Sequence, residues 1–304
     1  MNTDLKKVAG EFGLHVETCE QAKNSVLSQT FIVNETHILR SRKLHDDTLV
    51  RFKKEQALVT SVKSLSSLEF PELMPCKSGE AFVIQGNLLW AAYPLIAGDV
   101  QCSWWNLENL DDDARKDLYK TLKILHGQTM GKLVSIPGES IFLNDIRRWL
   151  IDVPGDTLDT RQCTRLEQAL SKVRNFEQNL SEKDLCFIHG DYHPGNIVFR
   201  ENKVAGLIDL DWSRKGYYME DLAYTLMTLM RDFRRPIFVF NKDEFDAALQ
   251  GYGLRSSDMS VFWEYMLLAV FYDLYLMRTL PELRDKTHLV PFQLSFLDDL
   301  LLRR

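Results

Sequence analysis

The first part of the chain alternates short apolar runs with polar turns, which is the pattern of a β-rich segment. Residues 28–33 and 36–43 predict one hairpin, and residues 80–86 and 88–96 predict another about a Gly-Asn pair, a favoured tight turn. Between the hairpins, residues 47–65 carry apolar side chains at roughly helical spacing. This part of the chain is therefore predicted to form a small sheet and one helix.

Helical periodicity dominates the rest of the chain. The predicted helices each carry an apolar stripe and cover residues 112–130, 159–180, 219–233, 242–252 and 258–280. One compact β signal interrupts them at residues 186–211, where apolar runs flank a polar loop. A β-rich front and a helical back predict an α+β chain of two lobes, residues 1–94 and 95–304, joined by a hinge near residues 93–103.

Composition narrows the class of protein only slightly. A net charge of −6 argues mildly against nucleic acid or an anionic membrane as the main partner. The 5 cysteines are scattered and form no C-x-x-C pair, so neither a disulfide framework nor a structural zinc site is expected. The N-terminus lacks an apolar signal core, and Asp273 breaks the longest apolar run. We expect a cytoplasmic protein of undetermined oligomeric state.

One loop concentrates the candidate chemistry. His189, Asp191 and Asn196 stand in the segment His-Gly-Asp-Tyr-His-Pro-Gly-Asn, and Asp209 ends the next apolar run. A tight structural turn, a metal cluster or a catalytic loop would each use such residues. The spacing suits phosphoryl transfer, in which positioning and charge stabilisation do most of the catalysis. Asp191 would orient an attacking hydroxyl and accept its proton, while the oxygens of Asn196 and Asp209 are suitable ligands for magnesium.

The segment 189–196, followed by Ile-Asp-Leu-Asp at 208–211, resembles the aminoglycoside phosphotransferase and choline kinase-like family. The resemblance implies a two-lobed protein-kinase-like fold, with a small antiparallel β-sheet N-lobe carrying one key helix and a larger, mainly helical C-lobe. It implies that Asp191 is the catalytic base and that Asn196 and Asp209 bind Mg2+. It also implies ATP or GTP as co-substrate and a small hydroxyl-bearing molecule as acceptor.

Neighbouring residues of the motif have several possible roles. His189 and His193 could be metal ligands, but the resemblance implies that they shape the loop by hydrogen bonding. Asp221 lies in a segment that resembles the family's helix after the metal strand, and it is expected to brace the loop. Asp211 is either a second metal contact or a solvated turn residue. Dinuclear metallophosphoesterases also use D-x-H segments, but the other histidines lie in none of their ligand segments.

The front of the chain supplies the expected nucleotide contacts. Arg40 stands on a predicted strand where the family has Lys or Arg, and it is expected to grip the α- and β-phosphates. Glu55 falls at the corresponding helix position and is expected to steady Arg40. The phosphate loop upstream lacks glycine, and Asn24 and Ser25 resemble a degenerate version of it.

The segment 93–98 resembles the inter-lobe hinge, so main-chain groups of Leu95 and Ile96 are expected to pair with adenine. The acceptor site is expected beside the catalytic Asp. Aromatic residues there would bind a quaternary ammonium or would simply form core; they are Trp212, Tyr217, Tyr218, Trp263, Tyr265, Phe271, Tyr272 and Tyr275. Acidic residues would bind a polycation or form a solvated face; they are Asp232, Asp243, Glu244 and Asp246.

The acceptor therefore stays open among an aminoglycoside, choline or ethanolamine, homoserine and a sugar-like molecule. The arginines of residues 231–236 would favour an anionic acceptor, or they would only complement a helix C-terminus. A catalytically weak nucleotide-binding regulatory protein with the same fold is the alternative function. The missing glycines favour that alternative, and the intact set of Asp191, Asn196 and Asp209 opposes it. Phosphorylation of a protein side chain is a third possibility.

Overall fold

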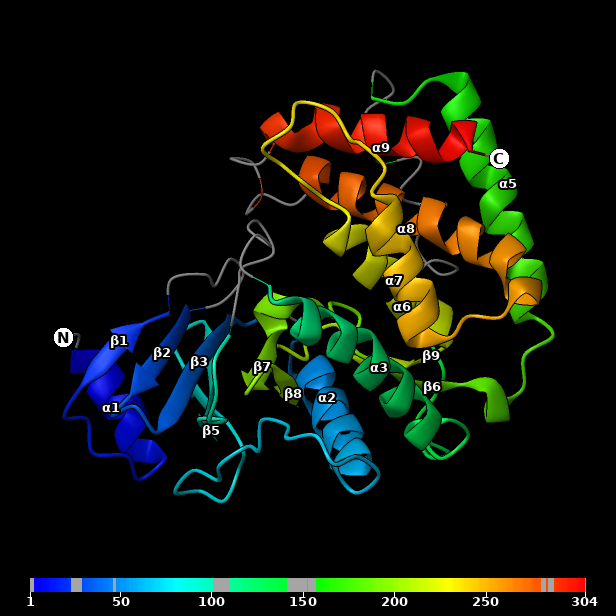
Figure 1. Cartoon of the computed structure of the whole chain (residues 1–304). Helices are drawn as coiled ribbons and strands as arrows, with labels where there is room; N and C mark the ends of the chain where they lie inside the picture. Colours follow the sequence, from blue (N-terminus) through cyan, green and yellow to red (C-terminus); the bar gives the residue numbers. More distant parts are fainter. Residues whose placement is uncertain are drawn as a thin grey trace.

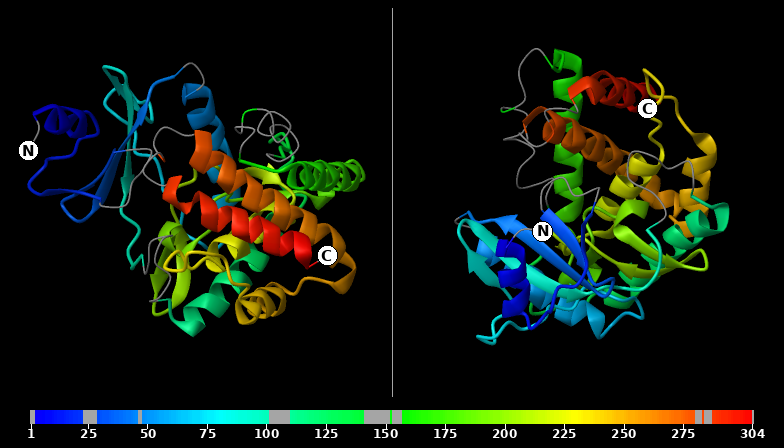
Figure 2. Two further views of the ribbon diagram at one scale, coloured as in Figure 1. Left: turned by 90° about the horizontal axis from the view of Figure 1, so that it is seen from above. Right: turned by 90° about the vertical axis from the view of Figure 1, so that its left-hand side faces the viewer.

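Two bodies make up the computed structural model, a small sheet and a larger group of helices (Figure 1). The two further views keep the sheet and the helical body on opposite sides (Figure 2). This is the two-lobed α+β arrangement that the sequence predicted. The structure describes residues 3–22, 29–45, 48–100, 110–140, 152, 157–279, 283 and 287–303.

The N-lobe is a five-stranded antiparallel sheet of order β1-β2-β3-β5-β4. Both predicted hairpins are present. The strands are β1 (Cys19–Gln21), β2 (Gln29–Val33), β3 (His37–Lys43), β4 (Val83–Gln85) and β5 (Leu88–Pro94). Helix α1 (Thr3–Glu11) lies on the side of the sheet away from the helical body and packs Val8 and Ala9 against Val33, Leu39 and Trp90 (Figure 2).

Helix α2 (Thr48–Lys63) is the predicted helix between the hairpins, and it packs against both lobes. Phe52 belongs to a small cluster with residues of β5. About two and three turns later, Leu58 and Val62 belong to the main core of the helical body. The chain then pairs Glu69 with Gly206 as an isolated bridge. The boundary between the lobes therefore runs through α2.

The C-lobe is mainly helical. Its long helices are α3 (Asp112–Thr129), α5 (Thr160–Glu177), α6 (Tyr218–Leu229), α7 (Lys242–Tyr252), α8 (Met259–Thr279) and α9 (Val290–Leu302). Two short ladders carry the loops of the site: β6 (Cys186–Ile188) with β9 (Arg214–Gly216), and β7 (Ile197–Arg200) with β8 (Lys203–Leu207). Asp111 caps α3, and Asp159 forms a capping box with Gln162 at the start of α5. The sequence analysis missed α9.

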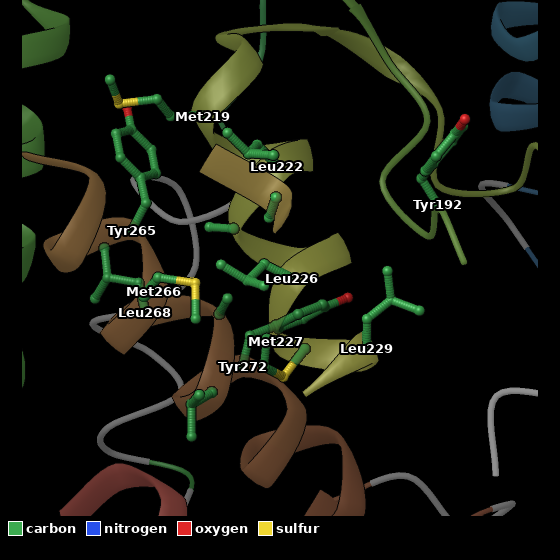
Figure 3. Packing of buried hydrophobic residues seen from close by; sticks show 14 of the residues in the cluster. Tyr192, Met219, Leu222, Leu226, Met227, Leu229, Tyr265, Met266, Leu268 and Tyr272 are labelled. Carbon is green, nitrogen blue, oxygen red and sulfur yellow. The ribbon is translucent and has the colours of Figure 1, made fainter. Parts of the chain in front are cut away.

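Helix α8 is the centre of the helical core. Residues Ser256–Thr279 are long and apolar enough to cross a membrane, but 67% of their apolar 18-residue window is buried inside the protein. Figure 3 shows Tyr265 of α8 beside Met219 of α6, and Met266 belongs to the same core cluster as Leu222. The apolar surface of α8 is therefore satisfied by packing against neighbouring helices.

The connection between the lobes is pinned to the C-lobe just after β5. Asp99 and Phe199 of β7 exchange two backbone hydrogen bonds, of 2.9 Å and 2.8 Å. Gly98 has a φ of +135°, and a Cβ there would lie 2.5 Å from the carbonyl oxygen of Phe199. Glycine is required because a side chain would push the connection away from β7. The predicted hinge near 93–103 stays a prediction, and residues 101–103 lie outside the described residues.

A buried polar cluster holds α5, α6 and β9 together beneath the site. Arg214 forms an ion pair with Glu220, and both side chains are almost fully buried. Glu177 of α5 accepts a hydrogen bond of 2.6 Å from the Tyr265 hydroxyl and one of 3.2 Å from Ser140. Burial, and then the negative charge of Glu220, raise the pKa of Glu177 to about 7. Ionisation of Glu177 near neutral pH therefore introduces an unfavourable buried charge into this cluster.

Glu177→Gln should stabilise the protein at high pH. The folded-state pKa of Glu177 lies above its unfolded value, so the folded state binds the extra proton and ionisation of Glu177 costs stability as pH rises toward 7. Glutamine keeps the two accepted hydrogen bonds without the charge. We expect chemical unfolding at pH 8 to show a gain of about 1–2 kcal/mol, shrinking toward pH 5. Glu167→Gln, at an exposed position of α5, is the control. No gain at pH 8 would contradict this assignment.

Candidate active site

The catalytic loop follows β6 and turns sharply at Gly190. Gly190 has a φ of +80°, and a Cβ there would lie 2.5 Å from the carbonyl oxygen of Trp212. A glycine is needed both for the left-handed backbone and for this close approach. The loop then forms a 3-10 turn at Pro194–Asn196, and His193 Nδ1 accepts the N–H of Gly195 at 3.0 Å. These contacts fix the backbone on both sides of Asp191.

A single buried carboxylate holds the start of this loop. Asp221 of α6 is 0% exposed and accepts the backbone N–H groups of His189, at 2.8 Å, and Gly190, at 2.9 Å. His126 Nε2 of α3 lies 3.2 Å from the same carboxylate. Burial favours the neutral acid, but the bond to His126 and the surrounding positive dipoles outweigh it and lower the pKa of Asp221. The Asp221 carboxylate is therefore ionised and holds the loop backbone, as its expected bracing role requires.

Both histidines of the motif are used inside the loop. The His189 ring is 0% exposed; its Nε2 lies 3.1 Å from the carbonyl oxygen of Ile208, and its Nδ1 accepts the N–H of Asp191 at 3.3 Å. Burial lowers the pKa of His189, which favours the neutral ring. Within the described part of the chain, no group of three or more His, Cys, Asp or Glu side chains is arranged to hold a metal ion. The contacts of His189 and His193 are those of loop-shaping residues.

Asp191 lies at the open edge of the loop, with 24% of its side chain exposed. Its Oδ2 accepts a hydrogen bond of 2.8 Å from the amide of Asn196 and lies 3.5 Å from His193 Nε2. Burial opposes ionisation, but His193 and Asn196 outweigh it and lower the pKa of Asp191 below its usual value. The carboxylate is therefore ionised at neutral pH and can accept a hydrogen bond from an incoming hydroxyl.

The β7–β8 hairpin brings Asn196 and Asp209 together. Ile197 pairs with Leu207, and the N–H of Ile208 donates to the carbonyl oxygen of Asn196 at 3.0 Å. The two predicted metal-binding residues therefore lie next to each other across the open end of the ladder. Asp209 has a φ of +57°, a left-handed conformation that is uncommon for a residue other than glycine and that occurs often at functional sites.

The donor atoms of this pair suit a hard divalent cation. The amide nitrogen of Asn196 donates to both the main chain and the carboxylate of Asp191, at 3.0 Å and 2.8 Å. This orientation assigns the other end of the amide, its oxygen, to the role of acceptor or ligand. Asp209 adds a carboxylate with 39% of its side chain exposed. One or two such oxygens, completed by phosphate oxygens and water, are the usual protein share of a magnesium site.

Arg40 of β3 reaches across to the loop after β8. Its Nη2 lies 2.9 Å from Asp209 Oδ1 and 3.1 Å from Asp211 Oδ2. Asp211 also lies 2.5 Å from Arg42 Nη2, and only 24% of its side chain is exposed. Of the two roles open for Asp211, the solvated turn residue is wrong, because the side chain bridges two arginines. Arg40 stands at the expected site, with its guanidinium beside the predicted metal ligand.

Glu55 does not take the partner that the sequence indicated. Its two oxygens accept hydrogen bonds of 2.7 Å and 3.2 Å from Arg42, so the expected pairing of Glu55 with Arg40 is a misassignment. Alternate residues of a strand face the same side, which places both arginines toward α2 and the C-lobe. Arg42 is therefore a site residue that the sequence analysis missed. The sequence signal for Arg42 was its position two residues after Arg40, in the segment Arg-Ser-Arg.

The remaining nucleotide-site predictions are less constrained. Asn24 and Ser25 lie outside the described residues. Leu95 donates its main-chain N–H to the carbonyl oxygen of Thr36 at 2.8 Å, so that N–H is engaged within the N-lobe. Ile96 lies against Gly206 of β8, where an added Cβ would be 3.0 Å from its side chain. The expected base contacts of Leu95 and Ile96 stay predictions.

Comparison with known proteins gives the family. The sequence profile of the "Phosphotransferase enzyme family" matches residues 18–259, which is most of the chain and includes the loop, both arginines and Asp221. The chain belongs to this phosphotransferase family. No curated protein matches the sequence.

Solved structures share the fold of this phosphotransferase over nearly its whole length. The GDP and kanamycin complex of APH(2")-IIia has a TM-score of 0.73 at 14% identity, covering 100% of each chain. Amicoumacin kinase hAmiN in complex with AMP-PNP, Ca2+ and Ami has a TM-score of 0.71 at 14% identity, covering 97% of this chain and 92% of that one. Macrolide 2'-phosphotransferase MphH from Brachybacterium faecium has a TM-score of 0.63 at 16% identity, covering 95% and 98%. The likeness establishes the predicted protein-kinase-like fold.

The aromatic residues of this phosphotransferase are mostly core. Tyr265 and Phe271 are fully buried, and Tyr217 and Tyr272 are 7% and 5% exposed. The partly buried members pack against the same core; they are Trp212, Tyr218, Trp263 and Tyr275. This packing favours the core interpretation over an aromatic pocket for a quaternary ammonium.

Three of the four candidate acids of the C-lobe, Asp232, Glu244 and Asp246, are already paired within the chain. Glu244 is buried with Arg115 and the Tyr119 hydroxyl. Asp232 binds two arginines of the segment 231–236, at 2.6 Å and 3.1 Å. Asp246 pairs with the lysine one turn before it. Within the described residues, only Asp232 pairs with arginines of this segment, and neither the acids nor the arginines by themselves point to an acceptor.

A buried ion pair near Asp191 was not predicted from the sequence. Arg231 Nη2 lies 2.9 Å from Asp273 Oδ2, and Gln293 also donates to this carboxylate. Burial, together with the charge of Asp191, raises the pKa of Asp273. In the sequence, Asp273 was noted only because it interrupts an apolar run. A lone charge in the most apolar helix was the signal that could have marked it as a buried, paired group.

Asp221→Asn should lower kcat about tenfold and destabilise the protein by about 1–3 kcal/mol. The reason is that an amide leaves one of the two buried loop N–H groups without an acceptor. Steady-state kinetics and chemical unfolding measure the two effects. The matched control is Asp117→Asn, which alters a carboxylate that accepts the N–H of Val204 at 2.9 Å on the far side of β8. The control should lose stability while keeping kcat. A wild-type kcat in Asp221→Asn would show that the loop does not depend on this anchor.

Proposed function

We propose that this protein transfers the γ-phosphoryl group of a nucleoside triphosphate to a hydroxyl of a small molecule. The observation that carries the proposal is the convergence of Asp191, Asn196 and Asp209 on one end of the β7–β8 hairpin. Arg40, from the N-lobe, lies 2.9 Å from Asp209 at the same end of the hairpin. Phosphoryl transfer needs an oriented hydroxyl and concentrated positive charge around the phosphates, and these groups are suited to supply both.

In the proposed reaction Asp191 accepts a hydrogen bond from the acceptor hydroxyl and takes its proton as the new P–O bond forms. The lowered pKa of Asp191 makes it a weak base, so its main contribution is orientation. A weak base is sufficient because the hydroxyl loses its proton late in a loose transition state. His193 and Asn196 hold the carboxylate in place through their contacts with Oδ2.

Asn196 and Asp209 would hold Mg2+, which when bound neutralises charge that develops on the phosphate oxygens. Arg40 would contact the α- and β-phosphates. Its guanidinium presents several donors in a fixed fork, which matches phosphate oxygens bidentately. Burial of the Arg40 side chain, 12% exposed, strengthens such contacts by excluding water. Asn24 and Ser25 are proposed to border the same phosphates.

The similar solved structures guide the choice of acceptor to test. The similar structures include complexes described with kanamycin, gentamicin, spectinomycin and amicoumacin. These support polyhydroxylated antibiotics as the first acceptors to screen for this chain, ahead of choline or ethanolamine, homoserine and simple sugars. The buried aromatic residues give choline less support.

A catalytically weak regulatory protein remains the second candidate, supported by the lack of glycine in the phosphate loop. Three observations oppose it. Asp191 is ionised and held in place, the predicted metal-binding residues adjoin one another, and the buried anchor Asp221 keeps the loop in shape. A regulatory protein would have no need of all three.

Asp191→Asn should reduce kcat by about 10²- to 10⁴-fold, because the amide cannot accept the hydroxyl proton. Nucleotide affinity should stay within about twofold of wild type, since Asp191 does not face the proposed base or α-phosphate contacts. Coupled-assay kinetics with an acceptor panel and calorimetry with AMP-PNP measure the two quantities. Asp113→Asn, on α3 with 76% of its side chain exposed, is the control. Wild-type turnover by Asp191→Asn would remove the proposed base, and absence of turnover with every acceptor would favour the regulatory alternative.

A further inference from the structure

We propose that Arg42, and not Arg40, is the residue that fixes α2 and the metal-binding loop relative to the sheet, while Arg40, beside Asp209, faces the proposed phosphate site. The inference rests on the proposed function, because it assigns a positioning role within that site. Kinase-like sites ordinarily use one strand cation both for the phosphates and for the helix glutamate. In this chain the two tasks are divided between two arginines of β3.

The contacts of the two guanidinium groups differ in kind. Arg42 binds both oxygens of Glu55, at 2.7 Å and 3.2 Å, and lies 2.5 Å from Asp211. Arg40 has neither Glu55 oxygen among its bonds within the described residues, and it lies beside Asp209 and Asp211 at the metal-binding end. Arg42 therefore joins two secondary-structure elements, whereas Arg40 faces the reacting groups.

The position of α2 explains why this contact matters. Phe52 of α2 packs with the N-lobe sheet, while Leu58 and Val62 pack in the C-lobe core. Glu55 lies between these two anchors, where the helix passes from one lobe to the other. A bidentate bond at this point fixes the sheet to a helix that is itself held by the C-lobe. The Arg42 guanidinium also stacks 5.5 Å from the Phe52 ring, which restricts it further.

Asp211 extends the same contact to the metal-binding loop. Its Oδ1 faces Arg42 and its Oδ2 faces Arg40, so the two arginines hold opposite oxygens of one carboxylate. Asp209, two residues earlier, carries the proposed metal ligand on a left-handed backbone. Because that conformation is intrinsically unfavourable, neighbouring contacts must maintain it. Arg42 maintains the conformation of Asp209 through Asp211, and it would therefore affect metal binding without contacting the metal.

The alternative is that Arg42 is a second phosphate ligand. The bidentate bonds of Arg42 to Glu55 and its ion pair with Asp211 argue against this, since phosphate would have to displace a bidentate carboxylate. The two roles predict different effects on nucleotide binding with and without metal. A phosphate ligand acts on the nucleotide itself, whereas a positioning residue acts on the additional affinity that magnesium provides.

The test compares Arg42→Met, Arg42→Lys and Arg40→Met by calorimetry with AMP-PNP, with and without Mg2+. In Arg42→Met we expect metal-free affinity within about twofold of wild type and a loss of about 10- to 100-fold in the tightening caused by Mg2+, the size usual for residues that support metal ligands. Arg42→Lys should fall between, because an ammonium cannot form the bidentate bond. Arg40→Met should weaken metal-free binding.

A double variant checks the route of the effect. If Arg42 acts through Asp211, Arg42→Met combined with Asp211→Asn should be hardly worse than the more damaged single variant. Lys53→Ala, an exposed change on the same helix, is the control and should behave as wild type. Circular dichroism and thermal unfolding confirm that each variant is folded, and Arg42→Lys serves if Arg42→Met is not.

Two results would overturn the inference while leaving the proposed function intact. One is a loss of metal-free affinity in Arg42→Met as large as that in Arg40→Met, which would make Arg42 a phosphate ligand. The other is wild-type binding and turnover in Arg42→Met. Absence of AMP-PNP binding by the wild-type protein would instead overturn the proposed function, and this inference with it.

Discussion

The site depends on one electrostatic arrangement, a buried carboxylate that accepts two main-chain N–H groups of a tight loop. Asp221 fixes the backbone at His189 and Gly190, and that backbone orients Asp191. The cost of burying this charge is offset by His126 and by the loop itself, so the anchor and the loop stabilise each other. The helical core around α6 and α8 supplies the rigid support on which this arrangement stands.

Residues close together along the chain were predictable, and contacts between distant elements were not. The spacing of Asp191, Asn196 and Asp209 is fixed by a loop and one hairpin, so the sequence alone was sufficient to group them. The fold class followed from the periodicity and from the resemblance, and it is confirmed. The partner of Glu55 depends on where α2 packs between the lobes, which no local pattern encodes.

Burial explains the other misjudgements. The aromatic residues considered for the acceptor pack in or against the core, and three of the four acids form ion pairs within the chain. A list of residues cannot distinguish such groups from a binding surface. The pair of Arg231 and Asp273 shows the converse, because a charge that interrupts an apolar helix has its partner far away in the sequence. Charged residues inside apolar helices therefore carry more information than charged runs on the surface.

The contacts of Gly98 and Asp99 with β7 fix the point at which the connecting chain joins the C-lobe. Ala97 is held as well, since its carbonyl oxygen accepts a hydrogen bond of 2.7 Å from Arg200. On the other side, Leu95 is bonded to Thr36 of the N-lobe. The main-chain contacts therefore change from the N-lobe to the C-lobe between Leu95 and Ala97, within the segment proposed to meet the nucleotide base. A base bound there would touch main chain whose neighbours are held by different lobes.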